Sequence, residues 1–304
     1  MAQDNLVATL QRGGNIQAFY GEDALSAAHQ AAANGDIITL SAGEFNGCEV
    51  TKAITLRGEG MDKTHIKSQM TFTIPEKSTR TLHLEGLNIS YSGGGYSGCV
   101  KFSGSDGSEK VIISKCYIDP YEANDKVAFD KCNGTIIQSH INGPIGAYEG
   151  SHVTCLNSIF DFPRCEGNGK FDVENCHLTP HYAFQLEYVH YSTIKNTIIQ
   201  RANPSFDSTN TYSHCLTAGL STIPVSDFGW SLPDTWDVWQ SIVGDNYHLT
   251  EEAAATYLGT DGTQIGIYGG MYPYDPTPSY PLVKKLDVIG SHKNGKLNVK
   301  INVE

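Results

Sequence analysis

The clearest pattern along the chain is a six-residue segment with an apolar residue at each end. Six copies align without gaps, and their first residues are Leu84, Ile113, Ile136, Cys155, Val173 and Ile194. Their last residues are Ile89, Ile118, Ile141, Phe160, Leu178 and Ile199. Successive copies begin 18 to 29 residues apart. Self-similarity at such a period is typical of solenoid proteins, in which each repeat packs only on its neighbours.

The repeat length indicates which solenoid this is. One coil of a three-sided parallel β-helix consists of three short strands joined by turns, which requires a repeat of this length. Ankyrin or tetratricopeptide repeats would show helical periodicity, and these segments do not. We therefore predict an all-β fold, a single-stranded right-handed parallel β-helix. The first and last positions of the six copies should form two buried apolar columns.

The positions between the two columns are small or polar, as expected where the chain bends. The fourth position holds Leu87, Cys116, Ser139, Ser158, Cys176 and Thr197. The cysteines of the repeat could bind a metal or carry redox chemistry, but their register favours small buried free thiols. Asn157, Asn175 and Asn196 share one register, which predicts an asparagine ladder that satisfies backbone groups of the turns.

The start of the chain predicts a cap, because a solenoid exposes its core at each end. Residues 22–34 place Leu25, Ala28 and Ala32 on one helical face, and Gly35 follows as a helix stop. Strands at 37–40 and 53–60 then complete a first coil. The stretch from Gly35 to Gly60 resembles the opening of secreted proteins of the pectate-lyase-like β-helix superfamily. That resemblance implies the fold, and it implies that any catalysis lies on an outer face of the helix.

The pattern changes after residue 226. Trp230, Trp236 and Trp239 cluster there, either to stack on sugars or to pack an irregular segment over the helix end. A final strand pair, 286–289 and 297–303, is joined through Asn294 and Gly295, a strong hairpin signal. We predict an N-terminal cap at 1–35, a β-helix at 36–226, and a C-terminal segment at 227–304 packed on the helix end.

Charge and cysteine content limit the partners. A net charge of −12 argues against a general nucleic-acid binder, which needs a basic surface. No apolar run is long enough for a transmembrane helix, so we expect the protein not to be transmembrane. The eight cysteines contain no CxxC pair, which disfavours structural zinc and leaves disulfides open. Residues 261–274, together with the final strand pair, resemble tails of exported β-helix proteins. This resemblance implies a secreted, periplasmic or outer-surface location in a Gram-negative bacterium.

Candidate chemistry lies in the turns that follow the second apolar column, because stacked coils would align them about 5 Å apart. The predicted catalytic residues are Asp161, Arg164, His181 and Arg201, and the predicted substrate-binding residues are Tyr121, Glu122 and Tyr182. Arginine and histidine beside a carboxylate suit β-elimination of a uronic acid, whereas paired acids suit glycoside hydrolysis. The same residues could instead be solvated turn residues that bond local backbone.

Other features leave the function open. The motifs of polygalacturonases and of calcium-dependent pectate lyases are absent, which disfavours a standard pectinase. No cofactor is predicted, although Asp119, Glu122, Asp125 and Asp130 could hold calcium without forming a recognised loop. The histidines near the repeat, His140, His152, His177 and His190, are expected at the surface. We predict a β-helix that binds or processes a polysaccharide or surface glycan as a lyase or hydrolase; the alternative is a non-catalytic adhesin or structural rod.

Overall fold

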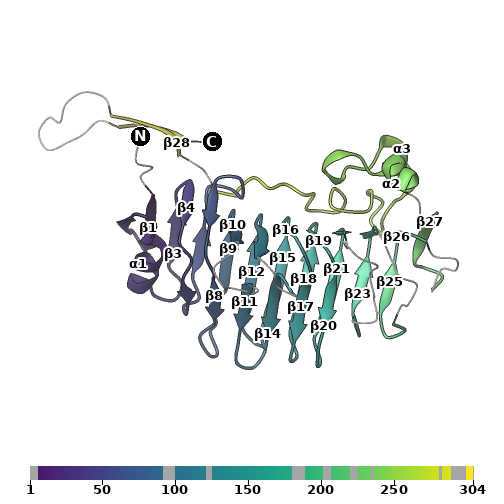
Figure 1. Cartoon of the computed structure of the whole chain (residues 1–304), viewed down its shortest axis with the longest axis horizontal. Helices are drawn as coiled ribbons and strands as arrows, with labels where there is room; N and C mark the ends of the chain where they lie inside the picture. Colours follow the sequence, from purple (N-terminus) through teal and green to yellow (C-terminus); the bar gives the residue numbers. More distant parts are fainter. Residues whose placement is uncertain are drawn as a thin grey trace, which may run out of the picture.

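A computed structural model gives the fold of the chain as a right-handed parallel β-helix (Figure 1). It describes residues 6–91, 100–120, 125–179, 189–200, 207–219, 225–233, 236–280, 283–288 and 299–303. Within these ranges, three long sheets run side by side along the helix axis, and we name them sheets A, B and C. The predicted fold class is confirmed.

Each sheet takes one strand from most coils. Sheet A contains, in spatial order, β2 (Asn15–Tyr20), β1 (Val7–Arg12), β3 (Ile37–Leu40), β6 (Thr55–Arg57), β9 (Leu82–Glu85), β12 (Lys110–Ser114), β15 (Asn133–Ile137), β18 (His152–Leu156), β21 (Lys170–Glu174), β23 (Thr193–Lys195) and β25 (Thr211–Ser213). Sheet B contains β27 (Gly229–Leu232), β26 (Cys215–Ala218), β24 (Ile198–Ile199), β22 (His177–Leu178), β19 (Ile159–Phe160), β16 (His140–Ile141), β13 (Tyr117–Pro120), β10 (Asn88–Tyr91), β7 (Thr64–Ile66) and β4 (Gly43–Phe45). Sheet C contains β20 (Pro163–Cys165), β17 (Ile145–Tyr148), β14 (Val127–Asp130), β11 (Val100–Ser103), β8 (Thr71–Thr73) and β5 (Glu49–Val50).

The two predicted apolar columns line the interior. In sheet A, register pairs join Leu84, Ile113, Ile136, Cys155, Val173 and Ile194 in that order. In sheet B, Ile89 pairs with Ile118 and Ile118 with Ile141, while Phe160 pairs with Leu178 and Leu178 with Ile199. All twelve side chains are buried. Because side chains alternate along a strand, a fixed register keeps each column inside over many coils.

Sheet C adds an aromatic column that the repeat did not reveal. Phe72, Phe102 and Phe129 occupy one register and are buried. Their ring centroids lie 4.6 Å and 5.2 Å apart in stacked pairs. Stacked aromatic rings contribute beyond the apolar area that they remove from water. This column anchors the middle coils of the helix.

The turn between sheets A and B uses left-handed backbone in successive coils. Lys115, Gln138, Asn157, Asn175, Asn196 and His214 all have φ between 46° and 54°. The residue that follows the left-handed one points inward, and the residues at this position in adjacent coils are joined by hydrogen bonds. Ser139 Oγ accepts from the Cys116 N–H, and Thr197 Oγ1 accepts from the Cys176 N–H. The buried cysteines are free thiols, as predicted, and burial raises their pKa.

The N-terminal cap has more parts than predicted. Helix α1 (Ala24–Ala31) lies inside the expected range, and Ala24, Leu25 and Ala28 are buried. In addition, β1 pairs antiparallel with β3, and β2 pairs antiparallel with β1. This hairpin was not predicted from the sequence, although Gly13 and Gly14 between the two strands are a two-residue hairpin signal. It closes the edge of sheet A over the first coil.

The C-terminal part corrects one prediction. Strand β27 extends sheet B beyond residue 226, and residues 260–280 run back along the side of the helix instead of staying at its end (Figure 1). Helices α2 (Trp236–Ile242) and α3 (Glu251–Thr256) precede this run. Strands β28 (Val283–Val288) and β29 (Val299–Val303) pair antiparallel and overlap the predicted strand pair at 286–289 and 297–303. Asn294 and Gly295 lie outside the described residues, and no described helix is long and apolar enough to cross a membrane.

Candidate functional site

The outer face of sheet B carries one continuous column of side chains. In register order, it contains Glu44, His65, Asn88, Tyr117, His140, Ile159, His177, Ile198, Leu216 and Trp230. The first half is polar and partly exposed, whereas the second half is largely apolar and buried. The change marks the point at which another part of the chain covers the sheet.

That cover is a small second core. Ile198 and Leu216 of sheet B pack with Trp239 of α2 and with Ile265, and all four are buried. Trp230 packs against this core and meets the ring of Tyr257 at 5.3 Å. We call residues 236–259 the C-terminal layer. Trp230 and Trp239 therefore serve packing, and the side chain of Trp236 lies outside the described residues.

Residues 260–280 form a strap along the turn between sheets A and B (Figure 1). The side chains of the left-handed turn residues hold the strap by hydrogen bonds. The Asn196 side chain accepts from the Thr260 N–H, and the Asn157 amide donates to the carbonyls of Ile267 and Gly269. Gln138 and Lys115 donate to the carbonyls of Pro273 and Thr277, respectively. Asn157 and Asn196 therefore bind the strap backbone in addition to shaping the turns. Since the strap runs opposite to the coil order, its end reaches the first coils, where Tyr280 donates to the Gly58 carbonyl.

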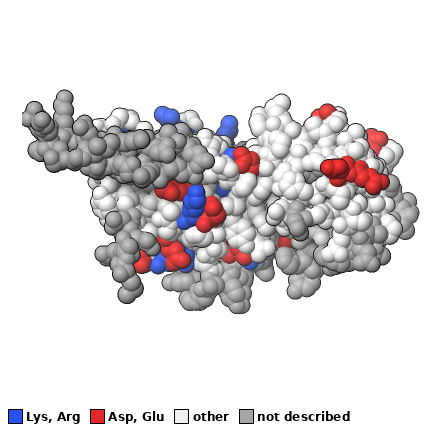
Figure 2. Space-filling view, turned by 90° about the horizontal axis from the view of Figure 1, so that it is seen from above, with Lys and Arg blue, Asp and Glu red and all other residues white. Residues whose placement is uncertain are grey.

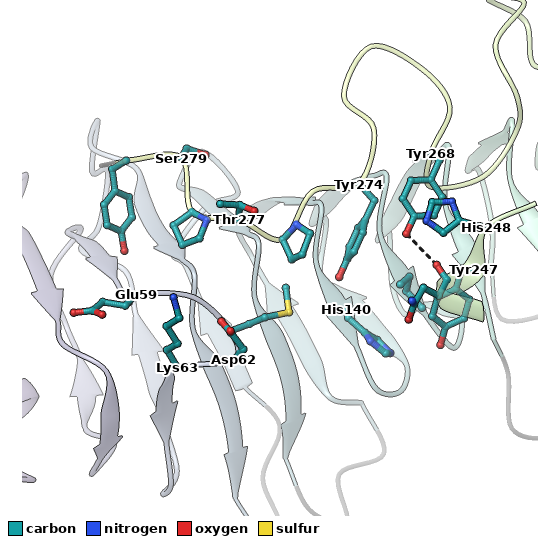
Figure 3. A pocket seen from close by; sticks show the side chains of 16 residues that line it. Glu59, Asp62, Lys63, His140, Tyr247, His248, Tyr268, Tyr274, Thr277 and Ser279 are labelled. Atoms are coloured by element: carbon teal, nitrogen blue, oxygen red, sulfur yellow. Dashed lines mark hydrogen bonds between the residues drawn. The ribbon is translucent and has the colours of Figure 1, made fainter. Parts of the chain in front are cut away.

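A cleft of about 1000 Å³ lies between the strap, the C-terminal layer and sheet B (Figure 3). Its charged or ionisable lining comprises Glu59, Asp62, Lys63, His140, Tyr247, His248, Tyr268, Tyr274 and Tyr280. Met61, Ile159, Asn246, Pro276, Thr277, Pro278 and Ser279 complete it. Binding sites for small molecules commonly combine such apolar and aromatic walls with a few convergent polar groups. This cleft is our candidate site.

One end of the cleft is built on strained backbone. Asn246 and Tyr247 have φ of 55° and 63°, a left-handed conformation that asparagine adopts readily but that costs a tyrosine about 1 kcal/mol or more. The turn is held by Tyr268, whose hydroxyl donates to the Asn246 carbonyl at 3.0 Å. The Tyr268 ring also stacks on His248, with centroids 3.7 Å apart. Strained residues that the surroundings hold in place often mark functional sites.

Tyr247 connects this end to two histidines of sheet B. Its ring meets His140 at 6.1 Å and His177 at 4.9 Å, both edge to face. Burial lowers the pKa of His140, although Asp119 acts in the opposite direction. Burial lowers the pKa of His177 to about 4, against a raising contribution from Gln200. Both imidazoles are therefore neutral near pH 7, and the prediction that His177 lies at the surface is wrong, because Tyr247 covers it.

The cleft tyrosines are neutral donors near pH 7. Burial raises the pKa of Tyr247 and Tyr268, and it raises that of Tyr274 to about 12. The pKa of Tyr280 is raised further, mainly by burial and in addition by the charge of Glu85. Each hydroxyl thus keeps its proton, and those of Tyr268 and Tyr280 already donate to the carbonyls of Asn246 and Gly58.

The structure places two of the predicted catalytic residues, and they have different neighbours. Arg164 lies on sheet C, where its guanidinium contacts Glu166 at 2.6 Å and Asp125 at 3.9 Å. Asp125 also accepts from the Tyr148 hydroxyl, and burial raises the pKa of its carboxyl group. Asp161 lies beside sheet B, and its charge raises the pKa of Tyr247. The remaining predicted site residues lie outside the described residues: Tyr121, Glu122, His181, Tyr182 and Arg201.

Three of the four acidic residues that could have bound calcium are described, and each lies near a different Lys or Arg side chain. Asp119 pairs with Lys126 at 3.1 Å, and Asp130 pairs with Lys101 at 2.8 Å. Asp125 faces Tyr148 and Arg164, as stated above. Within the ranges that the structure covers, no three histidine, cysteine or acidic side chains are grouped as metal ligands. These three carboxylates therefore do not form a common calcium site.

Sequence reasoning missed the cleft, although two signals pointed to it. Tyrosines and prolines are dense between Tyr268 and Pro281, a composition that suits an extended segment with aromatic contacts. The ladder asparagines also carry amide donors that one turn cannot satisfy alone. Together, the two signals could have predicted an extended segment laid along the turns.

Comparison with known proteins adds little. No family model matches the sequence, and no curated protein matches it. A solved structure of a PL6 family alginate lyase is similar, with a TM-score of 0.30 and 12% sequence identity. The match covers 83% of this chain and 58% of the lyase, so this chain spans less than two thirds of that protein's length.

Proposed function

We propose that the chain is a carbohydrate-binding β-helix protein whose cleft, between the strap and sheet B, holds part of a glycan. The observation that carries the proposal is the lining: Tyr247, Tyr268, Tyr274 and Tyr280 share the cleft with two histidines and three charged side chains. Sugar rings present C–H faces that pack on aromatic rings, and hydroxyl groups that bond polar side chains.

The dimensions and rigidity of the cleft support this proposal. A volume of about 1000 Å³ is at the upper end of the range for ligand pockets, so it can hold several sugar units. The strap wall is fixed by hydrogen bonds to the turn residues, among them Asn157 and Lys115. A preformed wall reduces the ordering cost that binding must overcome.

A second candidate function, processing of uronate chains, rests on the cluster around Arg164. That cluster combines a guanidinium with Asp125, whose buried carboxyl group has a raised pKa, and with the hydroxyl of Tyr148. A cation for a substrate carboxylate and a group that exchanges protons are what β-elimination requires. Asp161, His181 and Arg201 stay in this proposal as predicted catalytic residues, and Tyr121, Glu122 and Tyr182 as predicted substrate contacts.

We also propose that the protein acts outside the cytoplasm, in the periplasm or at the surface of a Gram-negative cell. This location rests on the resemblance of the opening and closing segments to exported pectate-lyase-like proteins. Cell fractionation, with a cytoplasmic and a periplasmic marker protein as controls, tests it. Recovery with the cytoplasmic marker would refute the proposed location.

Calorimetric titration with a panel of soluble oligosaccharides tests the binding proposal. We expect at least one glycan to bind, and Tyr274→Ala to weaken its affinity at least tenfold. Tyr272→Ala is the matched control, because Tyr272 is 53% exposed and is not part of the cleft lining. Equal loss in both variants, or the absence of binding across the panel, would contradict the proposal.

Assays for unsaturated products and for reducing ends separate binding from processing. If Arg164 takes part in elimination, Arg164→Ala abolishes product formation, whereas Arg80→Ala at an exposed position leaves it unchanged. Binding without any product would favour the alternative of a non-catalytic adhesin or structural rod.

A further inference from the structure

The cleft contains more acidic than basic side chains. Glu59 and Asp62 are its carboxylates, and Lys63 is its ammonium group. In the view of Figure 3, Lys63 is drawn between Glu59 and Asp62, so the lining has one more acidic than basic side chain. Near pH 7 the partly buried imidazole of His140 adds no positive charge, because partial burial lowers its pKa.

The cations that border the cleft already have partners within the protein. Arg57 lies 3.4 Å from Glu85 and stacks over the Tyr280 ring at 4.8 Å. Lys115 donates to the Thr277 carbonyl and lies 3.8 Å from Asp275. A ligand carboxylate that paired with Arg57 or Lys115 would displace one of these contacts, leaving a partly buried protein group without its partner.

The surface over the C-terminal layer adds no positive charge. Figure 2, which shows the face with the strap, displays Asp and Glu but neither Lys nor Arg among the described residues over α2 and α3, whereas Lys and Arg are drawn among Asp and Glu elsewhere on this face. The chain as a whole carries a net charge of −12. A field of this sign slows the approach of a polyanion and lowers its local concentration.

The uncharged polar groups of the cleft are well suited to hydroxyl groups. Thr277, Ser279 and Asn246 offer hydroxyl and amide groups, and the tyrosines keep their protons near pH 7. Such groups both donate and accept, as sugar hydroxyls do. They form hydrogen bonds to a neutral sugar without leaving a charge unpaired.

From this charge arrangement we infer that the cleft selects glycans without carboxylate or sulfate groups and rejects uronate chains. The inference rests on the proposed carbohydrate-binding function and narrows its substrate class to uncharged sugars. The rejecting groups are Glu59 and Asp62, since like charges brought together at an interface oppose binding. Any processing of uronates would then take place outside this cleft.

The test compares neutral hexasaccharides, such as cellohexaose and mannohexaose, with hexamers of galacturonate and mannuronate by calorimetry at low salt. We expect the best neutral hexamer to bind at least tenfold tighter than either uronate hexamer. The double variant Glu59→Gln and Asp62→Asn should reduce this ratio at least threefold by improving uronate binding. Glu76→Gln with Glu149→Gln, two exposed sites away from the cleft, removes the same charge and should leave the ratio unchanged.

The outcomes separate the two proposals. Uronate binding as tight as neutral binding, and lost in Tyr274→Ala, would overturn the selectivity while the carbohydrate-binding function stands. An unchanged ratio in the Glu59 and Asp62 double variant would also overturn it, because the rejecting groups would then be others. Absence of binding by every hexamer would overturn both proposals.

Discussion

The side-chain amide of Asn157 donates a 2.9 Å hydrogen bond to the carbonyl oxygen of Ile267, which lies 110 residues further along the chain. The bond joins a left-handed turn residue of the helix to the strap that walls the cleft. Stability of the turn and shape of the site therefore depend on the same side chain.

Replacing Asn157 should loosen the strap. In Asn157→Gly, the left-handed backbone is kept but the bonds to Ile267 and Gly269 are lost, so we expect a loss of about 1–2 kcal/mol in unfolding free energy. Asn157→Ala should lose more, because alanine disfavours the observed φ of 46°. Urea denaturation measures both losses, and hydrogen exchange at residues 264–270 should accelerate in both variants. Unchanged exchange there would show that the amide does not hold the strap.

A substitution at Gly270 tests the packing of the strap on the next turn residue of the column, Asn175. Gly270 has φ of 72°, and a Cβ atom there would lie 2.1 Å from Asn175 Nδ2. Gly270→Ala should therefore displace the strap from the turn and weaken glycan binding at least fivefold. Gly262→Ala is the control, because φ is also positive at 77° but the added Cβ meets no atom within 4 Å. Equal effects of the two variants would assign the loss to backbone strain alone.

The phenylalanine column should be a major contributor to stability. Phe102 stacks on Phe72 and Phe129 and is fully buried. Phe102→Ala should lower the unfolding free energy by about 3–5 kcal/mol, because it leaves a cavity that the coils above and below can only partly fill. Phe102→Leu should cost clearly less. The midpoint of urea denaturation gives the comparison, and similar losses in both variants would argue against the stacking contribution.

Acid should destabilise the packing of Tyr247 on sheet B. His177 has a folded pKa of about 4, below the ordinary value of 6.5, because it is buried. The unfolded chain therefore takes up a proton at higher pH than the folded chain. The stabilising contribution is complete above about pH 6.5 and is lost as pH falls from there towards 4.

The pH dependence of the unfolding free energy between pH 4 and 7 measures this effect. His177→Phe should flatten that part of the profile, because the ring keeps its packing but cannot be protonated. His65→Phe, at a partly exposed position of the same outer column, should leave the profile unchanged. A steep profile that persists in His177→Phe would assign the acid sensitivity to another group.

The coil architecture could be predicted from the sequence because one physical requirement repeats. Each coil must place an aliphatic side chain at a fixed register, as Ile118 and Ile141 do, and the requirement is visible in every copy. The column of Phe72, Phe102 and Phe129 was not predicted, because the lengths of the turns around it vary. Register in sheet C could therefore not be counted along the chain.

The sequence signals could indicate the strap but not the residues that line the cleft, because the cleft unites residues that are far apart in sequence. His140 comes from sheet B, Lys63 from a turn of the first coils, and Tyr274 from the strap. Their proximity follows from the path of residues 260–280, which no local propensity determines. Asp161 and Arg164 were predicted to share one turn, but Asp161 follows β19 of sheet B, whereas Arg164 lies in β20 of sheet C.

A crystal structure of the protein with its tightest-binding neutral oligosaccharide bound tests the central claim most directly. The account predicts sugar rings in the cleft, with one packed on the ring of Tyr274 and hydroxyl groups bonded to residues of the strap. Sugar density on another face of the helix, with the cleft free of it, would contradict the account.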